Sequence, residues 1–250
     1  MKCLILAAGY ATRLYPLTLD RPKPLLPLAG RPAIDHIIER IDEIAEVETI
    51  LVVTNEKFFK QFQSWQEDYS AGKVVKVLND RSLSEEDRLG AIGDIDFVLK
   101  EEGLDNDLLV IAGDNLFESG LREFVDFARQ RIPASSIGLY NLKDKEAVKR
   151  YSQVRLGANN RIIEFEEKPK DPTSTLVAKC IYFFPKGKLG KIAEYIASGG
   201  QIDAPGHYIS WLCRRDEVYG FTFCGKWYDI GNYETYKEAD EGFRLKKGER

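Results

Sequence analysis

The chain opens with MKCLILAAGYATRLYPLTLDRPKPLLPLAGRP, residues 1–32, and this stretch decides the fold. The apolar run of residues 3–8 ends at Gly9, which predicts a buried strand followed by a turn of small residues. A strand that is apolar along its whole length is typical of a parallel sheet covered on both faces. Small residues in the turn leave backbone N–H groups accessible, as in loops that hold phosphate groups.

Two basic side chains follow this turn, Arg13 and Lys23. Arg13 offers a planar fork for phosphate oxygens, and Lys23 offers a compact point charge. Prolines on both sides of Lys23 stiffen the segment that carries it. The pattern therefore predicts a nucleotide-phosphate site, and a surface turn with two solvated cations is the alternative.

The turn lacks both of the common nucleotide-binding motifs. A dinucleotide-binding turn reads G-x-G-x-x-G, but position 11 here is Ala, and the P-loop pattern G-x-x-x-x-G-K-S/T is absent from the chain.

The opening motifs resemble those of the sugar-phosphate nucleotidylyltransferase family, the NDP-sugar pyrophosphorylases of the glucose-1-phosphate thymidylyltransferase type. The family pattern L-A-A-G-x-G-T-R-L reads LAAGYATRL at residues 6–14, and P-K-P-L reads PKPL at residues 22–25. The resemblance implies that Arg13 and Lys23 are catalytic. Ala11 replaces the family's second glycine, which costs on the order of 1 kcal/mol if that residue needs a positive φ. The resemblance further implies nucleotide contacts at Leu6, Ala8, Gly9, Thr12 and Arg13.

Two separated motifs supply carboxylates. Asp114 follows the apolar run of residues 108–112, and Asp229 lies in WYDIG at residues 227–231. The resemblance implies that Asp114 and Asp229 hold Mg²⁺, which prefers oxygen ligands and keeps several waters. Turn formation or helix capping is the alternative for either residue alone.

The sugar site and the base site rest on the resemblance as well. EEKP at residues 166–169 implies that Glu167 orients sugar hydroxyls and that Lys168 holds the sugar phosphate. Lys179 replaces one of the family's small residues near the sugar pocket, where it would suit an anionic acceptor; a solvent-facing side chain is the alternative. Residues 79–95, NDRSLSEEDRLGAIGDI, correspond to the base-reading segment and give Asn79 and Gly90 as candidates.

The order of elements predicts an α/β fold. Apolar runs alternate with helical spacing as far as residue 134, which indicates a Rossmann-like, mostly parallel sheet flanked by helices. Strand-like runs with short connections follow and indicate a mixed β part, which the resemblance implies to be the sugar-binding part. We expect one domain over residues 1–250, with a nucleotide-binding half at 1–134, a sugar-binding half at 135–231 and a C-terminal helix at 232–250.

Composition excludes several classes of protein. The net charge of −4 argues against a mainly electrostatic nucleic-acid binder, and no apolar run approaches the ~18 residues of a membrane span. The four cysteines show no C-x-x-C spacing, and only two histidines are present. We therefore expect neither a thiolate metal site nor a Ser–His–Asp triad.

The resemblance implies transfer of a nucleotidyl group from an NTP to a sugar 1-phosphate, with dTTP or UTP and a hexose 1-phosphate as the expected pair. It further implies Mg²⁺ as cofactor, a cytoplasmic location and a homo-oligomer. Two alternatives stay open: a CTP-dependent cytidylyltransferase of a phosphoalcohol such as phosphocholine, and a regulatory homologue that binds nucleotide sugar without turnover.

Overall fold

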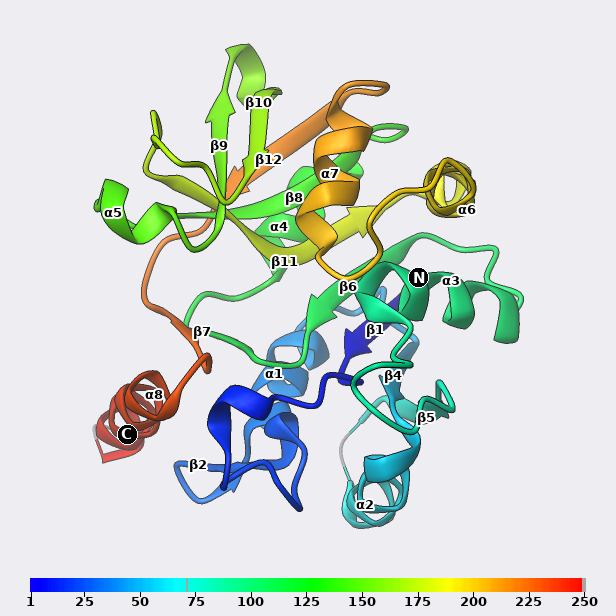
Figure 1. Ribbon diagram of the computed structural model, residues 1–250, viewed down its shortest axis with the longest axis vertical. Coiled ribbons are helices and arrows are strands. Elements are labelled where there is room, and N and C mark those ends of the chain that lie inside the picture. Colours follow the sequence, from blue (N-terminus) through cyan, green and yellow to red (C-terminus); the bar gives the residue numbers. More distant parts are fainter. Residues whose placement is uncertain (71, 249–250) are drawn as a thin grey trace. The chain divides into compact units, whose positions relative to one another are not determined.

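The computed structural model describes residues 1–70 and 72–248, with side chains as far as residue 245. The chain forms two compact units, each built from separated segments (Figure 1). The parallel-sheet unit contains Cys3–Arg88, Ile111–Leu121 and the described residues from Gly225 on. The mixed-sheet unit contains Met1–Lys2, Leu89–Val110 and Arg122–Cys224.

The parallel-sheet unit is built around strands in the order β6-β1-β4-β5. β4 and β5 run parallel, with Thr49 opposite Val74 and Thr54 opposite Asn79. The strands are β1 (Lys2–Leu6), β4 (Thr49–Thr54), β5 (Val74–Asn79) and β6 (Leu108–Ala112). The first residue of β1 and the first three residues of β6 are assigned to the mixed-sheet unit. Two short antiparallel pairs complete it: β2 (Pro27–Leu28) with β3 (Arg31–Pro32), and β7 (Asn115–Phe117) with β13 (Trp227–Asp229).

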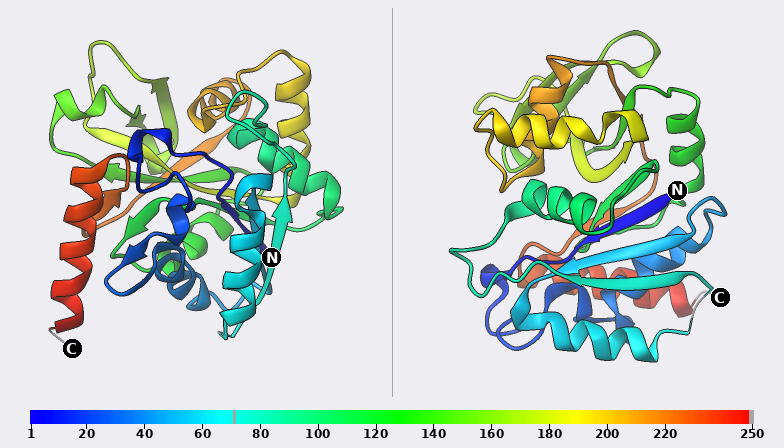
Figure 2. Two further views of the ribbon diagram at one scale, coloured as in Figure 1. Left: turned by 60° about the horizontal axis from the view of Figure 1, so that its bottom comes forward. Right: turned by 90° about the vertical axis from the view of Figure 1, so that its right-hand side faces the viewer.

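Three helices belong to this unit: α1 (Ala33–Asp42), α2 (Glu56–Asp68) and α8 (Tyr233–Gly248). α1 buries four isoleucines almost completely, at the i, i+3, i+4 and i+7 positions from Ile34 to Ile41, as the helical spacing predicts. α2 packs on β4 and β5 (Figure 2). α8 packs on β13 and β2, where the Asp240 carboxylate accepts a hydrogen bond of 2.7 Å from the Ala29 backbone.

The mixed-sheet unit has the predicted strand-rich pattern. β11 pairs antiparallel with β8 and β9, β10 pairs antiparallel with β9, and β12 runs parallel to β8. The strands are β8 (Ser135–Asn141), β9 (Ser152–Leu156), β10 (Ile162–Glu167), β11 (Leu176–Phe184) and β12 (Val218–Thr222). The helices are α3 (Gly90–Glu101), α4 (Arg122–Arg129), α5 (Lys145–Val148), α6 (Gly190–Ala197) and α7 (Pro205–Cys213).

The predicted α/β class, with a mostly parallel sheet flanked by helices, is confirmed. Helix α3 was missed, because Gly90 and Gly93 weaken the helical signal of a segment that buries Ile92, Ile95 and Val98 completely. Residues 89–110 belong to the mixed-sheet unit, and the predicted division near residues 134 and 231 stays a prediction. The roles given to the two halves stay predictions.

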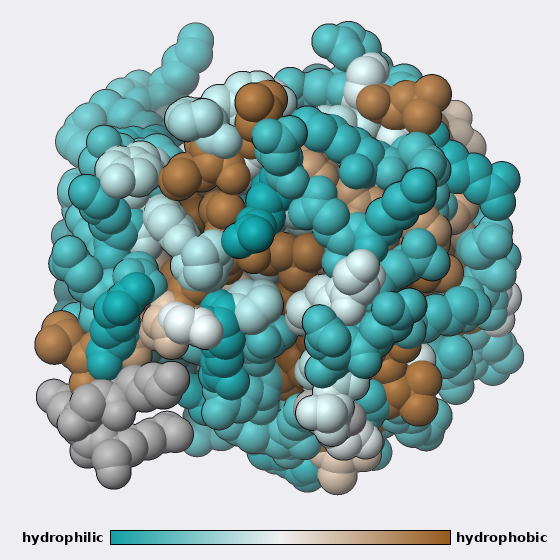
Figure 3. All heavy atoms as spheres, turned by 90° about the horizontal axis from the view of Figure 1, so that it is seen from below, coloured by the Kyte–Doolittle hydropathy of each residue, from teal (hydrophilic) through white to brown (hydrophobic). Residues whose placement is uncertain are grey.

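No helix in the described part of the chain combines the length and the apolar character needed to cross a bilayer. On the face shown in Figure 3, hydrophilic residues predominate and apolar residues form scattered patches.

Candidate functional site

The loop of residues 7–14, which follows β1, is held against the end of β4. The Ala7 N–H donates to Val53 O at 2.9 Å, and the Asn55 side-chain amide donates to Ala8 O at 2.8 Å. A 3₁₀ turn, η1 (Thr12–Leu14), ends the loop. These bonds fix the loop where the carboxyl ends of parallel strands meet, which is where such sheets bind ligands.

Ala11 lies in the left-handed region, with φ 50° and ψ 41°. The position therefore has the backbone conformation that favours glycine, the residue that the family pattern has there. The Thr18 hydroxyl donates to Ala11 O at 2.7 Å and helps to hold this conformation.

One cavity of about 350 Å³ brings together the four charged residues predicted from separate motifs. Arg13, Lys23, Asp114 and Asp229 all line it, and all belong to the parallel-sheet unit. The remaining lining residues are Gly9, Tyr10, Ala11, Thr12, Leu14, Glu85, Arg88 and Gly231.

Lys23 and Asp114 form an ion pair, with Nζ 2.8 Å from Oδ2. Their side chains are 16% and 33% exposed, so Lys23 is the more enclosed partner. Gly113 makes this approach possible: its N–H donates to Leu6 O at 2.8 Å, and a Cβ there would lie 2.9 Å from that oxygen and 3.0 Å from Pro24. A larger residue before Asp114 would push the end of β6 away from the segment that carries Lys23.

Asp229 reaches the cavity through the β7–β13 pair. It lies opposite Asn115, the residue after Asp114, and the Trp227 indole N–H donates to the Asn115 side chain at 3.3 Å. The capping role near α8 falls to Asn232, whose side chain accepts the Thr235 N–H at 2.9 Å. Helix capping therefore does not account for Asp229.

Comparison with known sequences identifies the family, since residues 2–244 match the family described as nucleotidyl transferase. The chain belongs to the nucleotidyl transferase family. The resemblance seen in the opening motifs is thereby confirmed.

Named relatives of this nucleotidyl transferase include the bifunctional protein GlmU of Methanocaldococcus jannaschii, which is 30% identical over 96% of this chain and 54% of its own length. Mannose-1-phosphate guanylyltransferase of Mycobacterium tuberculosis is 28% identical over 93% of this chain and 62% of its own length. The chain thus spans about half the length of the GlmU relatives it matches. A crystal structure of UDP-glucose pyrophosphorylase with UDP-glucose has the same fold, with a TM-score of 0.81, 22% identity and 98% coverage of both chains.

The other residues predicted for the nucleotide are placed as follows. Gly9 and Thr12 line the cavity, whereas Leu6 O accepts from Gly113 and Ala8 O accepts from Asn55. Asn79 does not line the cavity; its amide donates to Glu56 at 2.5 Å, and its side-chain oxygen accepts the Arg81 N–H at 2.8 Å.

Gly90 belongs to the mixed-sheet unit and has a positive φ of 73°. A Cβ at this position would lie 2.8 Å from Ile202 O, so packing alone accounts for the glycine. Base recognition by Asn79 and Gly90 stays a prediction.

The residues predicted for the sugar lie in the mixed-sheet unit. The Ser152 hydroxyl donates a hydrogen bond to the Glu167 carboxylate. Gly206 in α7 leaves room for this pair, because a Cβ there would overlap the Glu167 carboxylate and lie 2.6 Å from Ser152 Oγ. Lys168 is exposed and has a positive φ of 48°, and its N–H donates to Tyr151 O at 3.0 Å.

Lys179 is 3% exposed, so its side chain does not point to solvent. Its ammonium lies 4.1 Å from the centre of the Tyr151 ring, in a cation–π contact. Burial, with Cys180 and Glu167 nearby, raises the pKa of Tyr182 well above its ordinary value. Tyr151 connects the two lysines, because its ring contacts the Lys179 ammonium and its backbone oxygen accepts the Lys168 N–H.

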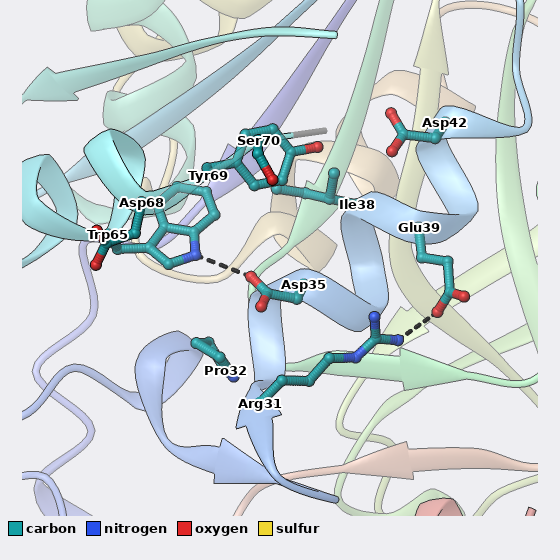
Figure 4. A pocket seen from close by; sticks show the side chains of 10 residues that line it. All are labelled: Arg31, Pro32, Asp35, Ile38, Glu39, Asp42, Trp65, Asp68, Tyr69 and Ser70. Atoms are coloured by element: carbon teal, nitrogen blue, oxygen red, sulfur yellow. Dashed lines mark hydrogen bonds and ion pairs between the residues drawn. The ribbon is translucent and has the colours of Figure 1, made fainter. Parts of the chain in front are cut away.

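A second cavity of about 510 Å³ lies between α1 and α2 (Figure 4). Two of its carboxylates have partners: Asp35 accepts the Trp65 indole N–H at 2.8 Å, and Glu39 pairs with Arg31. Burial, with Asp42 nearby, raises the pKa of Tyr69 to about 12. None of the residues predicted to bind nucleotide, metal or sugar lines this cavity.

Sequence reasoning missed Glu85 and Arg88, which line the first cavity from the segment after β5. The available signal was the departure of residues 79–89 from the family pattern, with an arginine directly before Leu89 and Gly90.

Proposed function

We propose that this chain transfers a nucleoside monophosphate from an NTP to a sugar 1-phosphate and releases pyrophosphate. The observation that carries the proposal is the single cavity in which Arg13, Lys23, Asp114 and Asp229 meet. Cations and carboxylates from four separate segments, beside a loop of small residues, suit a nucleoside triphosphate bound with a metal ion.

In the proposed reaction, an oxygen of the sugar phosphate attacks the α-phosphorus, and the bond to the bridging oxygen of pyrophosphate breaks in line. The chain needs no covalent nucleophile, because positioning and neutralisation of charge lower the barrier. Arg13 holds the β- and γ-phosphates; its side chain forms no hydrogen bond or ion pair with the other residues that the structure describes. Lys23 lies between the α-phosphate and the sugar phosphate, where negative charge is most crowded.

The donor set at the cavity suits Mg²⁺. Asp114 and Asp229 supply two carboxylates, and no cluster of three or more metal-ligating side chains occurs among the described residues. Mg²⁺ commonly takes one or two carboxylates and completes its shell with substrate phosphates and water. When bound, it would draw the phosphates together and neutralise charge on the pentavalent phosphorus.

For the acceptor, we propose that Glu167 orients sugar hydroxyls and that Lys168 holds the sugar phosphate. The hydrogen bond from the Ser152 hydroxyl supports a fixed orientation of the Glu167 carboxylate. The buried ammonium of Lys179 would suit an acceptor with an additional negative charge. The pairing of dTTP or UTP with a hexose 1-phosphate is part of the proposal, as are base contacts at Asn79 and Gly90, a homo-oligomeric state and a cytoplasmic location.

Pyrophosphate release tests the reaction class. The five common NTPs are combined with a panel of sugar 1-phosphates and phosphocholine, with Mg²⁺ present. Release with one NTP and one sugar phosphate supports the proposal. Release only with CTP and phosphocholine favours the phosphoalcohol enzyme, and binding of nucleotide sugar without turnover favours a regulatory homologue.

Substitution tests the site itself. Lys23→Ala or Asp229→Asn should lower kcat by roughly three orders of magnitude with an unchanged circular dichroism spectrum, because each removes charge stabilisation from the transition state. Lys60→Ala, which removes an exposed lysine from α2, is the matched control and should leave kcat unchanged. Near-normal turnover of either cavity variant contradicts the assigned roles.

A further inference from the structure

A third cation faces the cavity from residues 79–89, which depart from the family pattern. Arg88 lines the cavity together with Arg13 and Lys23, and Glu85 lies beside it. An Arg88 Nη1 atom lies 3.0 Å from Glu85 Oε1 and donates to Glu85 O at 3.2 Å. The two side chains are 34% and 45% exposed, so the ion pair is open to solvent and to a ligand.

Hydrogen bonds hold the backbone of this segment against the loop of residues 7–14. The Tyr10 hydroxyl donates to Ser82 O at 3.1 Å, which connects the two loops directly. Asp87, the neighbour of Arg88, accepts the N–H groups of Leu83 at 3.0 Å and Ser84 at 2.6 Å. The position of Arg88 is therefore set by the fold rather than by its contact with Glu85.

The composition of the cavity wall indicates which part of the nucleotide Arg88 would meet. The residues assigned to the NTP phosphates and the metal, Arg13, Lys23, Asp114 and Asp229, line the cavity. Four of those assigned to the nucleotide do not: Leu6, Ala8, Asn79 and Gly90. Arg88 thus lies on the phosphate side. A guanidinium binds two phosphate oxygens at once, and an exposed carboxylate partner is only a weak competitor.

We propose that Arg88 exchanges Glu85 for a terminal phosphate of the bound nucleoside triphosphate, so that two arginines hold the β- and γ-phosphates. This inference rests on the proposed function. Glu85 neutralises Arg88 in the absence of nucleotide, and the bound triphosphate displaces Glu85. Arg88 is then a residue that distinguishes a triphosphate from a monophosphate of the same nucleoside.

The test measures binding without turnover, by isothermal titration calorimetry of the full chain with Mg²⁺ and no acceptor. The probes are the NTP identified by pyrophosphate release and the corresponding NMP. Arg88→Ala should raise the Kd of the NTP roughly tenfold to a hundredfold, because the variant loses a charge-assisted hydrogen bond to a phosphate. The Kd of the NMP should change less than twofold. Arg88→Lys should give an intermediate Kd for the NTP, and Glu85→Gln should lower it.

Arg40→Ala is the matched control, because Arg40 forms an i,i+3 pair with Glu43 at 2.8 Å and lines neither cavity. An Arg88→Ala variant that binds both nucleotides as the unsubstituted chain does, or that weakens both equally, overturns the inference and leaves the proposed function standing. A chain that binds no NTP at all overturns both.

Discussion

Replacing Ala11 by glycine should stabilise the protein, which reverses the usual effect of a glycine substitution. Ala11 has φ 50° and ψ 41°, in the left-handed region. Its side chain is only partly buried, so loss of the methyl group removes little packing.

The magnitude follows from two opposing terms. The left-handed conformation costs an L-residue about 1–2 kcal/mol, because Cβ approaches the following carbonyl oxygen. Glycine lowers the free energy of unfolding by about 0.5–1 kcal/mol relative to alanine, because it loses more backbone entropy on folding. The difference is a net stabilisation of roughly 0.5–1 kcal/mol, and each 1 kcal/mol raises the Tm by about 2–4 °C in a chain of this size.

Urea unfolding followed by circular dichroism measures the free energy of unfolding of Ala11→Gly. The same substitution at Ala193, an exposed residue inside α6, is the control with the opposite sign and should cost about 1 kcal/mol. If Ala11→Gly destabilises the protein as much as Ala193→Gly does, the backbone argument is refuted.

Two further predictions concern pH and the acceptor site. Burial lowers the pKa of His36 in the folded protein from its ordinary value of 6.5. As the pH falls below 6.5, the unfolded chain therefore binds a proton at His36 more readily than the folded protein does, and the free energy of unfolding decreases. The decrease is at most about 1.4 kcal/mol for each pH unit, and His36→Gln should make it smaller. Urea unfolding of the variant and of the unsubstituted protein at pH 7.5 and pH 5.5 measures it; equal pH dependence in these two proteins would show that another group is responsible. Gly206→Ala should displace the Glu167 carboxylate and raise the KM of the sugar 1-phosphate roughly tenfold, while the KM of the NTP stays within twofold. Steady-state kinetics with each substrate varied in turn separates the two constants, and an unchanged KM for the sugar phosphate argues against Glu167 as its ligand.

The sequence predicted the parts of the fold and site that depend on local patterns. Uninterrupted apolar residues predict β1 and β6, and the isoleucine spacing predicts α1. Arg13 and Lys23, which short motifs place after a strand, line one cavity, and their catalytic roles stay predictions.

Features that depend on contacts between distant segments were not predictable. The hydrogen bond from Tyr10 to Ser82 O brings the loop with Arg88 to the cavity, and neither residue carries a sign of it in the sequence. In the same way, Gly206 gives no indication by itself that its missing side chain makes room for Glu167.

The β7–β13 pair can form only late in translation, because β13 is synthesised long after β7. Residues 115–117 are made long before residues 227–229, yet the two strands pair side by side and bring Asp229 into the cavity with Asp114. A nascent chain therefore carries the basic half of the site first and gains its second carboxylate only after residue 229 has left the exit tunnel. The proposed binding of a metal-bound nucleotide would therefore have to wait until residue 229 has emerged.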